Sequence, residues 1–204
     1  CGYKGYCIKE YFANYMLHLS DVTFHMDEGN KIEVHESKNE PWKVTLVDTG
    51  EATETGGRLR RIRDYLNDDT FCFTYGDGLG DVDIKKSIDF HKKHSKEATL
   101  TAVQPPGRYG SLKIINSTTV DQFVEKPAGD QAWVNGGFFV LQPSVLSRIN
   151  SDSISWEKDI LPILAREGQL NAFKHSGFWQ SMDTLRDVNF LNNIWDQGEA
   201  PWKK

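Results

Sequence analysis

Residues 71–78 of the chain read Phe-Cys-Phe-Thr-Tyr-Gly-Asp-Gly. A short apolar, β-prone run that ends at Gly-Asp-Gly is typical of a buried strand that stops at a carboxylate. The two glycines let the backbone turn sharply and let a ligand approach Asp77 closely. An ordinary turn, in which the aspartate bonds only to its own backbone, explains the same residues. The stretch therefore predicts a central strand and makes Asp77 a candidate site residue.

On both sides of this strand, strand patterns alternate with helix patterns. Further strands are expected at residues 22–26, 32–34, 44–47, 98–103, 112–115, 120–124, 137–141, 170–174 and 178–181. Helices are expected at residues 5–19, after Thr55, after a cap at Asp83, from Pro143, at 156–166 and at 184–195. This alternation predicts an α/β, Rossmann-like fold: a mainly parallel mixed sheet with helices on both faces and small β-hairpin appendages. We find no linker long enough to divide residues 1–204, so a single domain is expected.

Composition excludes several classes of protein. The 204 residues are 38% hydrophobic and 26% charged, which is typical of a globular domain. No apolar run approaches the roughly 20 residues of a membrane helix, so no membrane partner is expected. The net charge of −5 argues against a large nucleic-acid surface. The three cysteines form no C-x-x-C pair and fit a reducing, cytoplasmic compartment.

Two more expected strands end at charged side chains. Lys126 follows the 120–124 strand within Glu125-Lys126-Pro127, and Asp183 follows the 178–181 strand. Strand ends of one sheet can meet at a single crevice, where two carboxylates and an ammonium suit Mg²⁺ and phosphate. Read separately, Asp183 could simply cap the next helix, and Lys126 could form an exposed charge pair with Glu125.

Three weaker signals lie elsewhere in the chain. The amide of Asn135 in Asn135-Gly136-Gly137 could bond sugar hydroxyls, although a plain turn explains the motif equally well. Arg58 follows two glycines at an expected helix start, a position that suits an anion. His91 and His94 have the i,i+3 spacing of helix neighbours but lack a third metal ligand, so we interpret them as surface residues.

Taken together and in this order, the motifs resemble the sugar-phosphate nucleotidyltransferases, and most closely the branch that uses CTP and glucose 1-phosphate. The resemblance covers essentially the whole chain and rests on Val47-Asp48-Thr49-Gly50, Thr55-Gly56-Gly57-Arg58-Leu59, Tyr75-Gly76-Asp77-Gly78, Pro106-Gly107-Arg108-Tyr109-Gly110, Glu125-Lys126-Pro127, and residues 134–141, 177–187 and 200–203.

This resemblance implies a reaction and a set of roles. CTP and glucose 1-phosphate would give CDP-glucose and pyrophosphate, by in-line attack of the sugar phosphate on the α-phosphorus without a covalent intermediate. Asp77 and Asp183 would hold Mg²⁺, and Lys126 would act with them. Arg58 would also neutralise phosphate charge. Glu125, Asn135, Gly76 and Gly136 would contact the substrates, and a homo-oligomer is expected.

The family begins with a strand and a Gly-rich loop that grip the nucleotide, and these lie outside this sequence. Cys1-Gly2-Tyr3-Lys4-Gly5-Tyr6 is similar to the segment that comes directly after the family's second strand. We therefore expect either that this sequence is a fragment or that another segment supplies the first strand and the loop.

Other functions fit parts of the sequence. One is a nucleotidyltransferase of the same family that uses dTTP or UTP, because most residues that would read the base are outside the chain. Another is a metal-dependent glycosyltransferase, since Asp81-Val82-Asp83 has the Asp-x-Asp form, although helix capping explains Asp83 better. A third is a non-catalytic protein that retains only the sugar-phosphate pocket.

Overall fold

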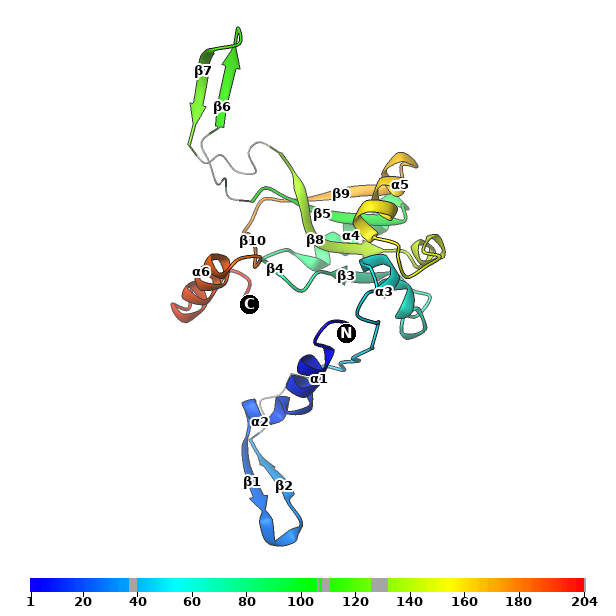
Figure 1. Cartoon of the computed structure of the whole chain (residues 1–204), viewed down its shortest axis with the longest axis vertical. Coiled ribbons are helices and arrows are strands. Elements are labelled where there is room, and N and C mark those ends of the chain that lie inside the picture. Colours follow the sequence, from blue (N-terminus) through cyan, green and yellow to red (C-terminus); the bar gives the residue numbers. More distant parts are fainter. Residues whose placement is uncertain (37–39, 106, 108–110, 126–131, 204) are drawn as a thin grey trace. The chain divides into compact units, whose positions relative to one another are not determined.

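The computed structural model describes residues 1–36, 40–105, 107, 111–125 and 132–203 (Figure 1). The chain separates into two compact units, residues 1–65 with 149–156 and residues 66–148 with 157–204. Each unit is described by itself. No helix in these described ranges is both long and apolar enough to cross a membrane.

A four-stranded mixed sheet forms the centre of the second unit, which confirms the α/β class (Figure 1). Its order is β3 (Phe71–Thr74), β8 (Val134–Leu141), β5 (Ala98–Val103) and β9 (Leu170–His175). β5 and β9 are parallel, while β8 is antiparallel to both β3 and β5, so the parallel share is smaller than the sequence predicts. β5 is almost wholly buried because it has a strand on each side and a helix against it.

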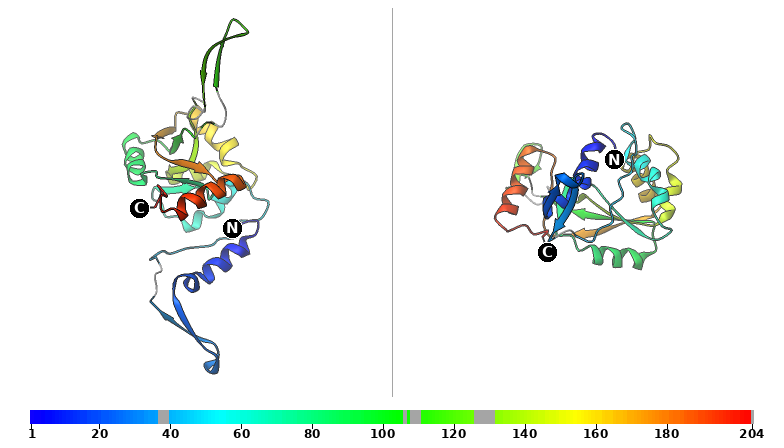
Figure 2. Two further views of the ribbon diagram at one scale, coloured as in Figure 1. Left: turned by 90° about the vertical axis from the view of Figure 1, so that its left-hand side faces the viewer. Right: turned by 90° about the horizontal axis from the view of Figure 1, so that it is seen from below.

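Helices of this unit pack on the sheet, and α4 starts at the cap that the sequence predicts. α4 (Ile84–His94) packs against β5, β8 and β9, and runs along one face of the sheet (Figure 2). The Asp83 side chain accepts a hydrogen bond from the Lys86 amide, which confirms the predicted cap. The remaining helical segments are η4 (Pro143–Arg148), η5 (Trp156–Ile160), α5 (Leu161–Arg166) and α6 (Leu185–Asp196), and Thr184 caps α6 in a capping box.

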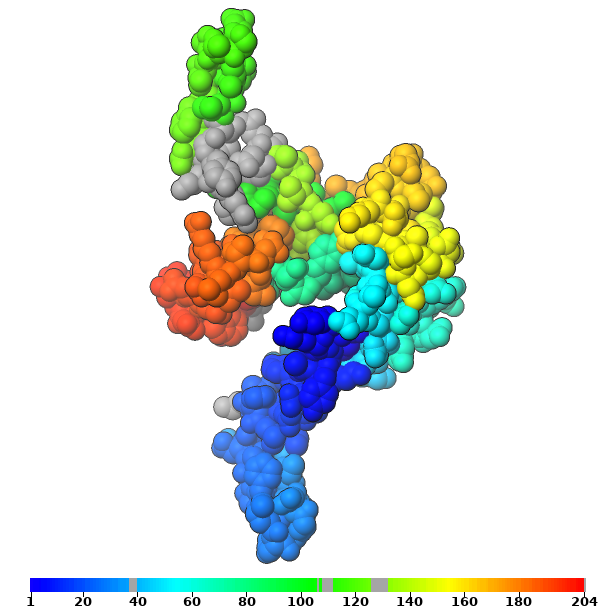
Figure 3. Space-filling model, in the orientation of Figure 1, coloured from blue at the N-terminus to red at the C-terminus, as the bar shows by residue number. Residues whose placement is uncertain are grey.

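Two small two-stranded sheets complete the second unit. β4 (Gly78–Gly80) pairs with β10 (Trp179–Ser181), and β6 (Ser111–Ile115) pairs with β7 (Thr119–Val124). In β6–β7 the predicted Asn116-Ser117 turn is confirmed, since both residues have left-handed φ angles of 48° and 64°. Figure 3 shows this hairpin as a narrow arm, and Phe123 on it is 60% exposed.

The first unit carries α1 (Gly5–Ala13), α2 (Tyr15–Leu19), the hairpin β1 (Asp21–His25) and β2 (Lys31–His35) with η1 (Met26–Glu28) between them, α3 (Thr55–Arg61) and η2 (Arg63–Tyr65). The single helix predicted over residues 5–19 is divided at Asn14, whose side-chain amide donates to the Glu10 carbonyl at 2.9 Å. Asparagine breaks a helix readily because its side chain competes for backbone groups.

The strand predicted at residues 44–47 is wrong for the described structure. Its described backbone contacts are with Cys1: Cys1 N donates to Val47 O at 2.6 Å, and Thr49 N donates to Cys1 O at 2.7 Å. Val44 is 46% exposed. An apolar run becomes a strand only when a neighbour satisfies its backbone along its length, and among the described residues only the Val47 carbonyl of this run accepts such a bond.

A buried polar cluster links α4 to β5. His91 is fully buried, and its Nδ1 lies 2.9 Å from Thr99 Oγ1, while His94 Nε2 lies 2.7 Å from the same hydroxyl. Gln142 Nε2, which can only donate, faces His91 Nε2 at 2.9 Å, so that nitrogen accepts. The surface placement expected for His91 is therefore wrong, because the threonine of the central strand pairs with it.

Burial lowers the pKa of His91, with a smaller contribution from His94, and burial also lowers the pKa of His94. At pH values below about 6.5, the ordinary histidine pKa, the unfolded chain therefore binds protons at these histidines that the folded chain does not bind. The free energy of unfolding should be highest above that pH and should fall as the pH drops from about 7.5 to about 5.5. Urea denaturation across this range should show the fall.

The variant His91→Gln should flatten this pH dependence, whereas His18→Gln, at an exposed position, should not. The carboxylates with lowered pKa, Asp48, Glu97 and Asp152, act mainly below this range. If the free energy of unfolding varied equally with pH in His91→Gln and in the parent protein, the assignment of this pH dependence to His91 would be contradicted.

Candidate active site

The β4–β10 ladder brings Asp77 and Asp183 to the same end of two neighbouring strands. Gly78 pairs with Ser181, and one step further Met182 N donates to Asp77 O at 2.7 Å. Asp183 follows directly, so the two predicted acids lie diagonally across the end of the ladder. Both residues are exposed. The structure thus joins two residues that are far apart in the sequence, as the motif analysis expects.

Neither carboxylate has a hydrogen bond or ion pair with another described residue. Beside them, a Cβ built on Gly76 meets nothing within 4 Å, so open space adjoins Asp77. Within the described residues no group of three or more His, Cys, Asp or Glu side chains could hold a metal ion. The protein therefore offers two carboxylates and room for further ligands, a donor set that suits Mg²⁺, which keeps several waters and binds substrate phosphates.

Asn135, the candidate sugar ligand, is held in a fixed orientation at the start of β8. Its Nδ2 donates to Tyr75 Oη at 3.3 Å, and its Oδ1 accepts from the Gly137 amide at 2.9 Å. Tyr75 Oη in turn donates to Glu157 Oε1 at 2.5 Å. Burial, and then this carboxylate, raise the pKa of Tyr75, so the phenol stays protonated. The sequence identifies Asn135 but not the two side chains that orient it.

The glycines beside Asn135 are required by close packing. Gly137 has a φ of 79°, and a Cβ there would lie 2.8 Å from the Tyr75 ring. At Gly136 a Cβ would lie 2.8 Å from Val103 Cγ1. The Gly136 carbonyl accepts a hydrogen bond from Trp179 Nε1 at 2.8 Å, which ties β10 to β8. Trp179 is a site-forming residue that sequence reasoning missed, because an indole in a strand is ordinarily part of a core.

The lysine motif is only partly described. Glu125 follows β7 and is exposed, while Lys126 lies outside the described residues. The expectation that a lysine after this strand neutralises phosphate is therefore untested by the structure, as is the role of Glu125.

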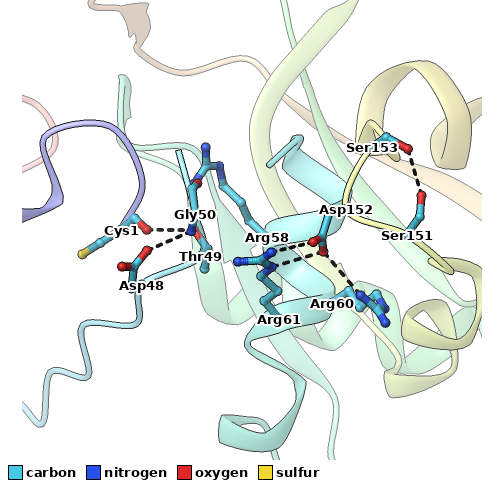
Figure 4. A network of polar contacts seen from close by, with 10 residues as sticks. All are labelled: Cys1, Asp48, Thr49, Gly50, Arg58, Arg60, Arg61, Ser151, Asp152 and Ser153. Atoms are coloured by element: carbon cyan, nitrogen blue, oxygen red, sulfur yellow. Dashed lines mark hydrogen bonds and ion pairs between the residues drawn. The ribbon is translucent and has the colours of Figure 1, made fainter. Parts of the chain in front are cut away.

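Arg58 belongs to the first unit, where its guanidinium organises a loop (Figure 4). Nη1 donates to Thr49 Oγ1 at 2.7 Å and to Gly50 O at 2.8 Å, and Nη2 donates to Glu51 O at 3.1 Å. Thr49 is buried and donates its own hydroxyl to Cys1 O at 2.9 Å. The structure thus shows Arg58 holding residues 49–51 in place, a role that the glycine-arginine pattern did not predict.

The neighbouring arginines of α3 are also engaged. Arg61 Nη2 lies 2.5 Å from Asp152 Oδ2, and Arg60 Nη1 lies 3.3 Å from Asp152 Oδ1 (Figure 4). Arg61, followed by weaker effects of Arg60, lowers the pKa of Asp152. These pairs are about 40% exposed and contribute little stability individually, but they attach α3 to residues 149–156 of the same unit.

Comparison with known proteins gives a consistent result. Residues 8–193 match the family model described as "Nucleotidyl transferase". Over 204 residues the chain is 61% identical to the glucose-1-phosphate cytidylyltransferase of Salmonella typhimurium, covering all of this chain and 79% of that protein. It is 33% identical to mannose-1-phosphate guanylyltransferase catalytic subunit beta of Xenopus tropicalis, covering 85% of this chain and 49% of that protein.

Among solved structures, HddC from Yersinia pseudotuberculosis superimposes with a TM-score of 0.56 at 23% sequence identity, covering 78% of this chain and 70% of that chain. At this level of identity the likeness supports the fold alone.

The orientation of Asn135 yields a testable prediction. Tyr75→Phe removes the hydroxyl that joins Asn135 to Glu157 and leaves half-buried polar groups short of a partner. We expect the free energy of unfolding to fall by about 1–3 kcal/mol. Urea denaturation measures the change, and Tyr65→Phe, at a position where the ring is 62% exposed, is the matched control. Equal losses in the two variants would show that the Tyr75 hydroxyl orients nothing.

Proposed function

The chain belongs to the nucleotidyl transferase family, and we propose that it transfers the cytidylyl group of CTP to glucose 1-phosphate, giving CDP-glucose and pyrophosphate. The observation that carries the choice of substrates is the identity with the Salmonella enzyme, which extends over the whole chain. The alignment of Asp77 with Asp183 at one end of β4–β10 supports the chemistry, because nucleotidyl transfer requires charge neutralisation at one point.

We assign the divalent cation, Mg²⁺, to Asp77 and Asp183. Their carboxylates are exposed, lie at one end of a two-stranded ladder and have no partner among the described residues. When bound, the cation would neutralise phosphate charge. The chain's own contribution is to hold the two carboxylates at a fixed separation beside the open space at Gly76.

The sugar phosphate is assigned to Lys126, Glu125, Asn135 and Gly136. Lys126 would act as a point charge on the phosphate, since a lysine ammonium suits that role. Asn135 would present an amide to the sugar hydroxyls from an orientation that Tyr75 and Gly137 set. At Gly136 the missing side chain makes room for Val103, so this glycine would contact the substrate through its backbone.

The reaction needs no general base under this proposal. A phosphate oxygen of glucose 1-phosphate attacks the α-phosphorus of CTP, and the bond to the departing pyrophosphate breaks, so no covalent enzyme intermediate forms. Catalysis then consists of positioning and electrostatic stabilisation. Arg58 contributes by fixing residues 49–51, and we propose that its guanidinium also attracts phosphate charge.

The glycosyltransferase alternative loses its support in the structure. Asp83 caps α4, and Asp81 Oδ1 faces His175 at 3.0 Å, so the two acids of the Asp-x-Asp form have separate structural partners. Two alternatives remain. A nucleotidyltransferase that uses dTTP or UTP would differ from the proposal in the nucleotide that the site accepts. A non-catalytic sugar-phosphate-binding relative would differ in having no turnover.

We further propose that the enzyme works in the cytoplasm as a homo-oligomer. All three cysteines are free, which suits a reducing compartment. Exposed apolar side chains on both hairpins suit contact with other subunits, since such surfaces commonly mark interfaces; they include Phe24, Ile32, Val34, Leu112, Ile114 and Phe123.

Pyrophosphate release tests the function directly. With glucose 1-phosphate and Mg²⁺, kcat/KM for CTP should exceed the values for UTP and dTTP by at least about tenfold, because a mismatched polar group in a recognition site costs about 1–3 kcal/mol. Faster turnover of UTP or dTTP than of CTP would favour the family member that uses that nucleotide. Binding of glucose 1-phosphate without pyrophosphate release from any nucleotide would favour the non-catalytic relative.

Removal of either acid tests the cation site. Asp77→Asn and Asp183→Asn should each lower kcat by about 100-fold or more while leaving the melting temperature nearly unchanged, because each removes a charged ligand from an exposed position. Asp89→Asn, at an exposed aspartate on α4, is the matched control. A kcat near that of the parent protein in both variants at saturating Mg²⁺ would refute the assignment.

A further inference from the structure

The ladder that carries the two acids is very short. β4 and β10 form three residue pairs, from Gly78–Ser181 to Gly80–Trp179. An isolated two-stranded ladder is at best marginally stable in water, and one of three pairs is less so. The relative position of Asp77 and Asp183 therefore depends on what holds the ladder from outside.

At the end opposite Asp77 and Asp183, the ladder meets a histidine of the main sheet. His175 is the last residue of β9, and its side chain is 11% exposed. Its Nε2 lies 3.1 Å from Phe178 O and 3.0 Å from Asp81 Oδ1. Asp81 directly follows β4, and its amide donates to Phe178 O at 3.2 Å. One imidazole thus contacts the segments at the ends of both strands.

The chemistry of this contact is specific. Both neighbours of Nε2 are acceptors, so Nε2 carries a hydrogen, which it donates to Phe178 O. Asp81 Oδ1 is buried and has no hydrogen-bond partner in the described part of the chain. A buried carboxylate oxygen is costly unless a compensating group lies beside it, and the nearest donor is His175 Nε2, 3.0 Å from that oxygen.

Gly177 shows that the packing around the pair is close. A Cβ at this position would overlap Asp81 Oδ1 and lie 2.7 Å from His175 Cε1. The φ angle of Gly177 is not in the left-handed region, so steric space, not backbone conformation, requires glycine here. A residue with a side chain at position 177 would separate Asp81 from His175 without altering either one.

We propose that Asp81 and His175 form a positioning pair that fixes β4–β10 on the main sheet and thereby sets the separation of Asp77 and Asp183 for the divalent cation. Asp81 is four residues from Asp77, about 13 Å along an extended strand, so the pair touches neither substrate nor cation. It acts by limiting the twist and slip of the ladder. This inference rests on the proposed function, because it deepens the cation assignment.

Three variants disturb the pair in different ways. His175→Gln keeps a side-chain donor but replaces the imidazole, Asp81→Asn removes the carboxylate charge, and Gly177→Ala separates the two groups. Lys86→Gln is the matched control, since it breaks the exposed Lys86–Asp83 ion pair of the same unit. Asp77→Asn serves as the reference for loss of the cation site.

Binding of Mn²⁺ alone, followed by electron paramagnetic resonance of the free ion, gives a readout that does not depend on turnover. We expect Mn²⁺ affinity to fall about tenfold in the three pair variants, as is common for residues that orient metal ligands. The Mg²⁺ concentration for half-maximal pyrophosphate release should rise in parallel, while Lys86→Gln behaves like the parent protein. A purely structural role would lower the melting temperature and leave the Mn²⁺ affinity of the folded protein unchanged.

The outcomes separate the two proposals. If Asp77→Asn weakens Mn²⁺ binding but the folded pair variants bind like the parent protein, the positioning pair is refuted and the cation site stands. If Asp77→Asn binds Mn²⁺ as the parent does, the cation assignment fails, and the positioning pair fails with it. Should His175→Gln not fold, Asp81→Asn and Gly177→Ala decide the question.

Discussion

The backbone hydrogen bond from Met182 N to Asp77 O, at 2.7 Å, is the interaction on which the candidate site depends. It extends the β4–β10 ladder by one step and joins two loops separated by over a hundred residues of chain. A hydrogen bond of this kind is worth only about 1 kcal/mol net. It can therefore fix the two carboxylates only because other contacts hold the ladder in register.

Those contacts come from three directions in the second unit. Trp179 Nε1 binds Gly136 O, so β10 is tied to β8 beside the candidate sugar ligand. His175 meets Asp81 and so ties the ladder to β9. Gln180 Nε2 donates to Asp187 Oδ1 at 3.1 Å, which connects β10 to the capping box of α6. Side chains without a role in the proposed chemistry thus hold the strands that carry the candidate site residues.

Local signals predicted the elements that depend on neighbouring residues. Asp83 caps α4 and Asn116-Ser117 makes the turn as predicted, whereas α6 is capped by Thr184 and not by Asp183, the residue considered for that cap. The failures occurred where the outcome depends on distant partners. Among the described residues the apolar run at 44–47 has a backbone bond only at Val47, and His91 is buried because its ring pairs with Thr99 and Gln142.

The sequence by itself determined the α/β class, most element positions and the identity of Asp77, Asp183 and Asn135 as candidates, because apolar periodicity, caps and glycines act over a few residues. Only the tertiary structure decided that Asp77 and Asp183 share one end of a ladder, that Tyr75 orients Asn135, and that Arg58 holds a loop. Strand pairing and side-chain hydrogen bonds between distant segments produce no repeating pattern of residue types in the sequence. Their geometry is set by packing, which exists only once the sheet has formed.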